Sequence, residues 1–135
     1  MKGGTAEWTR AGYEAFNAGD VPTLVAMLTL DFEWHEAAEI PGPKSAISRD
    51  EFVRFMRGFD MLWDEFAFEP LEIVEGDGAI YAKVRARGRG KASEELVEFE
   101  IHHVWRVRDG LFDRMDAYLE EADARGAAGV EVPAE

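Results

Sequence analysis

The side chains best suited to chemistry gather toward the C-terminal end of the chain. His102 and His103, two of the three histidines, are adjacent, and Asp116 and Tyr118 follow a short way along the sequence. A carboxylate beside an imidazole favours the protonated ring and fixes its orientation, which is the arrangement that a general acid or base requires. The segment therefore predicts acid–base chemistry if folding brings His103 to Asp116.

A predicted hairpin turn decides whether these residues meet. Asp109-Gly110 is a dipeptide typical of the two-residue type I′ turn, because both positions of that turn have positive φ. With this turn, His103 lies directly opposite Asp116 on the neighbouring strand, and alternation of side chains puts His103 inside and His102 outside. The expected interior face carries Phe99, Ile101, His103, Trp105, Phe112, Arg114, Asp116 and Tyr118.

Other residues of the hairpin bear on this register. The register sets Arg106 opposite Asp113, and such an opposite-charge pair supports it. A longer turn would shift the pairing and reverse the two faces. Arg114 would share the interior face and compete for the Asp116 carboxylate, and a His, Asp and Arg set of this kind also occurs as a purely structural network. The catalytic and the structural interpretation both remain open at this point.

The rest of the pattern predicts the elements that must hold this hairpin. Apolar residues recur at helical spacing in residues 6–18, and Gly19 follows as a C-terminal stop. Asp20 is placed to cap a short second helix, and Ser48 with Glu51 forms a capping box before a third. Strands are predicted at residues 31–36, 66–75, 79–88, 95–108 and 111–120, with a loop at 40–48. This order predicts an α+β domain with helices on one face of an antiparallel sheet.

Composition excludes several classes of partner and chemistry. Twenty-eight acidic and 15 basic residues give a formal charge of −13, which disfavours nucleic acid and anionic membranes. The sequence has no long apolar run and no signal peptide at its start, so we expect a cytoplasmic protein. Because cysteine is absent, disulfides, thiolate nucleophiles and cysteine zinc sites are excluded.

Four stretches carry a resemblance to a known family: AFNAGDVPTLVAMLTLDFEWHE, SRDEFVRFM, VRARGRGKAS and HVWRVRDGLFDRMDAYLEEADA. In their order and spacing they resemble the SnoaL-like, ketosteroid-isomerase-like branch of the nuclear transport factor two-like superfamily, over roughly Trp8 to Ala124. The resemblance implies a cone-shaped α+β fold, in which a curved antiparallel sheet and three helices enclose a pocket. It also implies a homodimer formed through the outer sheet faces. We expect one domain over residues 1–123 and a mobile tail at 124–135.

The resemblance also implies a range of activities and places for the active residues. Such proteins include isomerases, cyclases, dehydratases and epoxide hydrolases, and the fold does not choose among them. Their base is often a carboxylate on the late strands or just after the first strand, where this chain has Asp116, or His35 with Glu36. We predict that His103, Asp116 and Tyr118 are the catalytic residues of a cofactor-independent isomerase, cyclase or hydratase. Its substrate would be a small, largely apolar carbonyl or epoxide compound. The predicted substrate-binding residues are Trp34, His35, Phe59, Trp63, Trp105 and Arg114.

Two other functions fit the same sequence. One is a non-catalytic pocket that binds or carries a small apolar ligand, and the other is a dimerisation module whose interior is filled by its own side chains. An interior with no room for a ligand would favour the module. A metal site built from His35 and His103 has no ligand spacing to support it, so neither a metal nor another cofactor is predicted.

Overall fold

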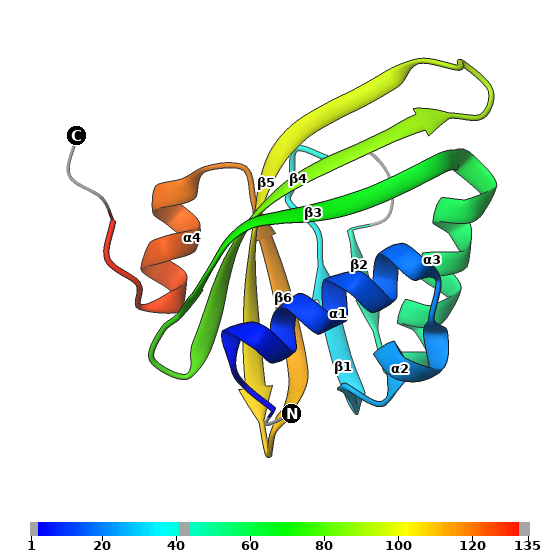
Figure 1. Cartoon of the computed structure of the whole chain (residues 1–135). Coiled ribbons are helices and arrows are strands. Elements are labelled where there is room, and N and C mark those ends of the chain that lie inside the picture. The colour runs from blue at the N-terminus through cyan, green and yellow to red at the C-terminus, as the bar shows by residue number, and fades with distance from the viewer. Residues whose placement is uncertain (1–2, 41–43, 133–135) are drawn as a thin grey trace.

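The computed structural model describes residues 3–40 and 44–132, apart from the side chains of Phe59 and Asp60. These residues form helices and strands in the order shown in Figure 1. The helices are α1 (Ala6–Ala18), α2 (Val21–Val25), α3 (Arg49–Leu62) and α4 (Glu121–Ala128). The strands are β1 (Leu28–His35), β2 (Ser45–Ile47), β3 (Trp63–Glu75), β4 (Ala79–Gly90), β5 (Leu96–Arg108) and β6 (Leu111–Tyr118). No helix within these ranges is long and apolar enough to cross a membrane.

The three predicted helices form where their capping residues place them. Thr5 accepts a hydrogen bond from the Trp8 backbone N–H at the start of α1, and Gly19 ends that helix with φ 69°. The Asp20 carboxylate accepts from the Thr23 N–H and caps α2. Ser48 accepts from the Glu51 N–H at 3.0 Å and begins α3. Local side-chain chemistry therefore fixes the boundaries of these helices.

All six strands belong to one sheet, in the order β2-β1-β6-β5-β4-β3. Neighbouring strands are antiparallel except for β1 and β6, which run parallel, so the sheet is mixed. β2 lies within the stretch that the sequence predicted as a loop, and pairs with β1 from Glu33 to His35. Residues 41–43 of that predicted loop lie outside the described residues. β1, from the first third of the chain, therefore lies beside β6 of the C-terminal hairpin.

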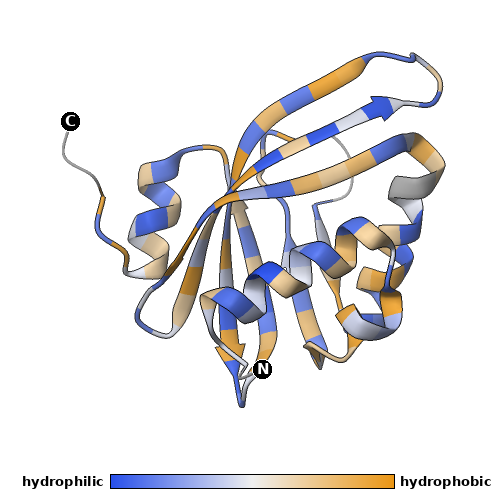
Figure 2. Cartoon of the chain, viewed as in Figure 1, coloured by the Kyte–Doolittle hydropathy of each residue, from blue (hydrophilic) through white to orange (hydrophobic). Residues whose placement is uncertain are grey.

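The two faces of the sheet are covered by different helices (Figure 1). α1 packs against β3, and α3 against β1, over an aromatic core that includes Phe32, Phe52 and Phe112. α4 packs on the opposite face against β4 and β5, where Ala124 and Ala128 are buried. Hydrophobic and hydrophilic residues alternate along the strands, as expected for a sheet whose faces have different neighbours (Figure 2). We call the face under α1 and α3 the inner face and the other the outer face.

The C-terminal segment differs from the mobile tail expected from residue 124. Residues 121–128 form α4, and Arg125 is almost entirely buried within it. Its guanidinium hydrogen-bonds the Glu121 and Glu72 carboxylates and lies over the Tyr81 ring, 4.5 Å from the centroid. Small alanines and glycines suggested an unattached end, but the same small residues allow α4 to approach the sheet closely. Residues 133–135 lie outside the described residues.

The turn between β5 and β6 has the predicted form. Asp109 and Gly110 have φ of 53° and 79°, the positive values that a type I′ turn requires. The first two cross-strand pairs also follow the prediction: Arg108 with Leu111 and Val107 with Phe112.

A β-bulge at Asp113 then changes the register for the remainder of β6. Asp113 has no partner on β5, so Arg106 pairs with Arg114 and each later pair is shifted by one residue. His103 consequently pairs with Ala117, and the prediction that it faces Asp116 is wrong. The shift moves Arg114, Asp116 and Tyr118 to the outer face, whereas Met115 and Ala117 point inward. His103 remains on the inner face and His102 on the outer face, as predicted.

Candidate functional site

His103 lies on the inner face within a box of aromatic rings. Its neighbours on the adjoining strands are Ala82 of β4 and Ala117 of β6, whose small side chains leave room for the imidazole. The His103 side chain is 0% exposed. The ring centroids around it belong to Phe68 at 5.2 Å, Trp34 at 5.6 Å, Tyr13 at 5.8 Å and Trp105 at 6.0 Å. The ring therefore lies in an apolar, water-excluded environment.

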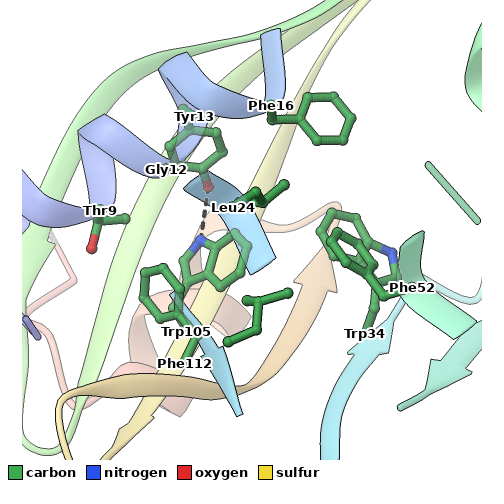
Figure 3. Close-up of a pocket in the computed structure, with 10 residues that line it drawn as sticks. Thr9, Gly12, Tyr13, Phe16, Leu24, Trp34, Phe52, Trp105 and Phe112 are labelled. Atoms are coloured by element: carbon green, nitrogen blue, oxygen red, sulfur yellow. Dashed lines mark hydrogen bonds between the residues drawn. The ribbon is translucent and has the colours of Figure 1, made fainter. Parts of the chain in front are cut away.

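A chain of hydrogen bonds joins α1 to β5 at this point. The indole N–H of Trp105 donates to the Tyr13 hydroxyl at 2.8 Å, and that hydroxyl lies 2.7 Å from Nδ1 of His103. Figure 3 shows Tyr13 and Trp105 pointing toward one another across the interior. The other ring nitrogen, Nε2 of His103, is buried and has no hydrogen-bond partner among the described residues.

Burial keeps the two titratable groups of this hydrogen-bond chain, His103 and Tyr13, neutral. It lowers the pKa of His103 to about 3, with a smaller contribution from the nearby His102. It also raises the pKa of Tyr13 well above its usual value, an effect that the hydrogen bond from Trp105 partly offsets. At neutral pH the interior therefore holds an uncharged imidazole and an uncharged phenol.

The free space beside Tyr13 and Trp105 is small. A cavity of about 20 Å³ lies between α1, β1, β5 and α3, which is room for about one water molecule. Trp34 and Phe52 lie across this space from Tyr13 and Trp105 (Figure 3). Both of those aromatic side chains are nearly fully buried, and their rings stack with centroids 5.1 Å apart. Any larger molecule must displace side chains of this wall.

A carboxyl group lies at the edge of the interior, next to Trp34. Glu36 follows β1 directly, and burial raises the pKa of its carboxyl. The Ala37 backbone N–H, which donates to Glu36 at 3.1 Å, offsets part of that shift, and so do the Trp34 indole and Lys44. The Trp34 indole N–H is buried and makes no hydrogen bond of normal geometry with any described residue. Glu36 is thus a carboxyl that holds its proton more readily than an ordinary glutamate does, beside an aromatic interior.

Comparison with known proteins identifies the family. The family model described as SnoaL-like domain matches residues 9–115, which is most of the chain. The chain belongs to the SnoaL-like domain family. No curated protein matched the sequence.

Solved structures share the fold of this SnoaL-like domain at low sequence identity. An NTF2-like protein from Burkholderia thailandensis is 22% identical with a TM-score of 0.79, over 95% of this chain and 98% of that one. A protein of ketosteroid isomerase-like fold from Catenulispora acidiphila, in complex with trimethylamine, is 12% identical with a TM-score of 0.75 (96% and 99% covered). TerC, co-crystallised with polyporic acid, is 16% identical with a TM-score of 0.73 (87% and 92% covered). Both the cone-shaped architecture and the wider NTF2-like fold predicted from the sequence are confirmed.

The structure separates the residues predicted to act together in this SnoaL-like domain. The Asp116 carboxylate lies on the outer face, where it accepts two hydrogen bonds from Arg114 at 2.8 and 3.0 Å. Tyr118 pairs with His102 on that same face. The predicted acid–base pair of His103 and Asp116 is therefore not formed, because the bulge turns Asp116 away from the interior.

The predicted substrate-binding residues are likewise divided between the inner and outer faces of the sheet. Trp34 and Trp105 line the interior cavity. Arg114 is on the outer face, as is His35, whose ring bonds the Glu33 carboxylate at 2.8 Å. Trp63 is half-buried beside Phe66, and the side chain of Phe59 lies outside the described residues. Within the described ranges, no three His, Asp or Glu side chains are close enough together to hold a metal ion.

Sequence reasoning missed the residue that contacts His103. Tyr13 lies in α1 one turn after Thr9 and one turn before Phe16, and this spacing places all three on the side of the helix that faces the cavity. A search for buried hydroxyl donors along that stripe would have selected Tyr13, because a tyrosine in a core usually bonds another buried polar group.

Proposed function

We propose that this SnoaL-like domain binds a small, largely apolar carbonyl or epoxide compound inside the cone and acts on it as a cofactor-independent isomerase, cyclase or hydratase. The observation that carries the proposal is Nε2 of His103, which is buried among four aromatic rings and has no hydrogen-bond partner in the part of the chain that the structure describes. A buried polar group without a partner costs about 1–3 kcal/mol, and a bound ligand that hydrogen-bonds it recovers that energy. The small molecules held by two proteins of the same fold, TerC and the Catenulispora protein, support a ligand-binding interior.

In this proposal two groups of the interior divide the chemistry. The Glu36 carboxyl, with its raised pKa, transfers a proton to or from a carbon next to the carbonyl. Neutral His103 hydrogen-bonds the carbonyl oxygen as negative charge develops there, in a site from which water is excluded. Asp116 takes no part because it lies on the outer face. Since the cavity of about 20 Å³ is too small for such a ligand, binding requires the wall that includes Phe52 of α3 to move outward.

The test is proton exchange from cyclic ketones in D2O, followed by ¹H NMR. The wild-type protein should accelerate loss of the signals from protons next to the carbonyl. Glu36→Gln should lower that rate at least about a hundredfold, the lower end of what general acid–base catalysis supplies. Glu39→Gln is the matched control, because Glu39 is an exposed carboxylate three residues along. Equal rates in wild type and Glu36→Gln would refute the catalytic role.

One observation favours a second candidate, a dimerisation module whose interior is filled by its own side chains. That observation is the size of the cavity, which leaves room for about one water molecule. Under this function no ketone or epoxide would bind, and analytical ultracentrifugation would show a dimer. Saturable ketone binding, measured by quenching of tryptophan fluorescence, would exclude this candidate.

A further inference from the structure

We infer that Trp105 and Tyr13 are positioning residues that fix His103 in the tautomer carrying its proton on Nε2, so that the interior presents a neutral N–H donor to an acceptor oxygen of the ligand. The assignment of the tautomer is independent of the proposed function, whereas the ligand class rests on it. Both follow from counting donors and acceptors in the buried chain of Trp105, Tyr13 and His103.

The indole decides the direction of the chain. An indole N–H is a donor only, so the Tyr13 oxygen accepts the hydrogen bond from Trp105 at 2.8 Å. The Tyr13 proton is then free to be donated to Nδ1 of His103, 2.7 Å away. Donation from Tyr13 requires a lone pair on Nδ1, and a neutral imidazole with a lone pair on Nδ1 carries its proton on Nε2.

The opposite tautomer leaves more polar groups unpaired. If Nδ1 of His103 donated to Tyr13, the phenol proton would have no acceptor among the described residues, and Nε2 would be a lone pair with no donor. The tautomer with Nε2–H leaves a single unpaired group, the N–H itself. Each buried polar group without a partner costs about 1–3 kcal/mol, so the tautomer with its proton on Nε2 is favoured. The doubly protonated ring is disfavoured because burial lowers the pKa of His103 to about 3.

The surroundings of Nε2–H define the group that it would bind. The His103 ring is enclosed by Phe68, Trp34, Tyr13 and Trp105, all within 6.0 Å between centroids, and no described carboxylate bonds it. A neutral donor in apolar surroundings favours a neutral acceptor, since burying an ion there carries a large desolvation cost. The ligand class is therefore an apolar compound with a neutral acceptor oxygen, such as a ketone, in contrast to a protonated amine, which offers no lone pair.

The tautomer is tested without any ligand, by long-range ¹H–¹⁵N correlation spectra of protein labelled with ¹⁵N-histidine. At pH 7 His103 should show a protonated Nε2 and an unprotonated Nδ1, and Tyr13→Phe and Trp105→Phe should each mix the two tautomers. Tyr81→Phe is the matched control, because the Tyr81 hydroxyl lies 2.9 Å from Nδ1 of His102 on the outer face. That variant should change the spectrum of His102 alone. A proton on Nδ1 of His103 in the wild type, or an unchanged His103 spectrum in folded Trp105→Phe, would overturn the inference.

The ligand class is tested with 1-indanone and with indane, which has the same rings but no oxygen. We expect 1-indanone to bind at least about tenfold more tightly, the equivalent of 1.4 kcal/mol, and to shift the Nε2–H resonance of His103. Trimethylammonium should leave that resonance unchanged. Equal binding of indanone and indane would refute the assignment of an acceptor oxygen. Failure of both to bind would refute the proposed function and with it the ligand class, while the free-protein spectrum would still decide the tautomer.

Discussion

Acid should destabilise this protein in a way that depends on His103. The pKa of the buried ring is about 3 in the folded state against 6.5 for an ordinary histidine, so the unfolded chain binds the proton more readily. Because stability rises with pH wherever the unfolded state binds more protons, the contribution is complete above pH 6.5 and declines as pH falls toward 3. Integrating the two titrations from pH 7 to pH 4.5 gives a loss of about 2.5 kcal/mol from this one side chain.

The measurement is urea unfolding at pH 7 and pH 4.5, followed by tryptophan fluorescence. Protonation of carboxylates contributes to the pH dependence as well, but it is common to the wild type and to His103→Gln and cancels in their difference. The wild type should therefore lose about 2.5 kcal/mol more than His103→Gln between the two pH values. The contribution of His102 is removed by a second comparison, between His102→Gln and the double variant His102→Gln/His103→Gln. The loss of stability from pH 7 to pH 4.5 should again be about 2.5 kcal/mol larger in the protein that keeps His103.

The result that would refute this reasoning is an equal loss of stability in the wild type and in His103→Gln. It would mean that the interior imidazole is hydrated or paired with a carboxylate, contrary to its burial among aromatic rings. A loss that persists in His103→Gln but disappears in His102→Gln would assign the pH dependence to the outer face, where burial also lowers the pKa of His102.

Three further substitutions test other parts of the structure by urea unfolding. Asp116→Asn should change the free energy of unfolding by less than about 1 kcal/mol, because the ion pair of Asp116 with Arg114 is partly exposed. It should also leave ketone binding intact, and a loss of binding would show that Asp116 belongs to the ligand site. Gly58→Ala should stabilise the protein by about 0.5–1 kcal/mol, because Gly58 is within α3 and an added Cβ meets no described atom within 4 Å. Destabilisation would contradict this open position. Gly76→Ala should destabilise by about 1–3 kcal/mol, because its Cβ would lie 2.1 Å from a carbonyl oxygen of α4; a neutral result would show that α4 is not docked there.

The sequence predicted the elements better than their pairing. Caps and turn residues act over a few neighbours, so Gly19, Asp20 and Ser48 could be interpreted without knowledge of the rest of the fold. The parallel pairing of β1 with β6, and the short strand β2, depend on contacts between distant segments. No local pattern specifies such contacts, which is why β2 was predicted as loop and α4 as tail.

The candidate site was half predicted. The inward direction of Trp34, Trp105 and His103 follows from alternation along strands, and the structure has all three side chains buried on the inner face. The residues after Phe112 break that alternation, because the apolar side chains are Met115 and Ala117, which strict alternation would have put on the outer face. This spacing is a signal for a bulge that the sequence analysis did not use. Tyr13 was missed for a different reason, since its partner lies ninety residues away in the chain.

The bulge at Asp113 decides which side chains of β6 reach the interior. If Asp113 paired with Arg106 in a regular ladder, two-residue periodicity would bring Arg114, Asp116 and Tyr118 into the cone and turn Met115 and Ala117 outward. A one-residue slip of β6 would thus replace a neutral apolar wall with two charges and a phenol, without any change in sequence. Deleting Asp113 removes this second register, because Arg114 would then follow Phe112 directly and keep its pairing with Arg106. The structure of the chain lacking Asp113 would test this directly: Met115 and Ala117 should stay inward, and an Asp116 beside His103 would show that Asp113 is not the bulge residue.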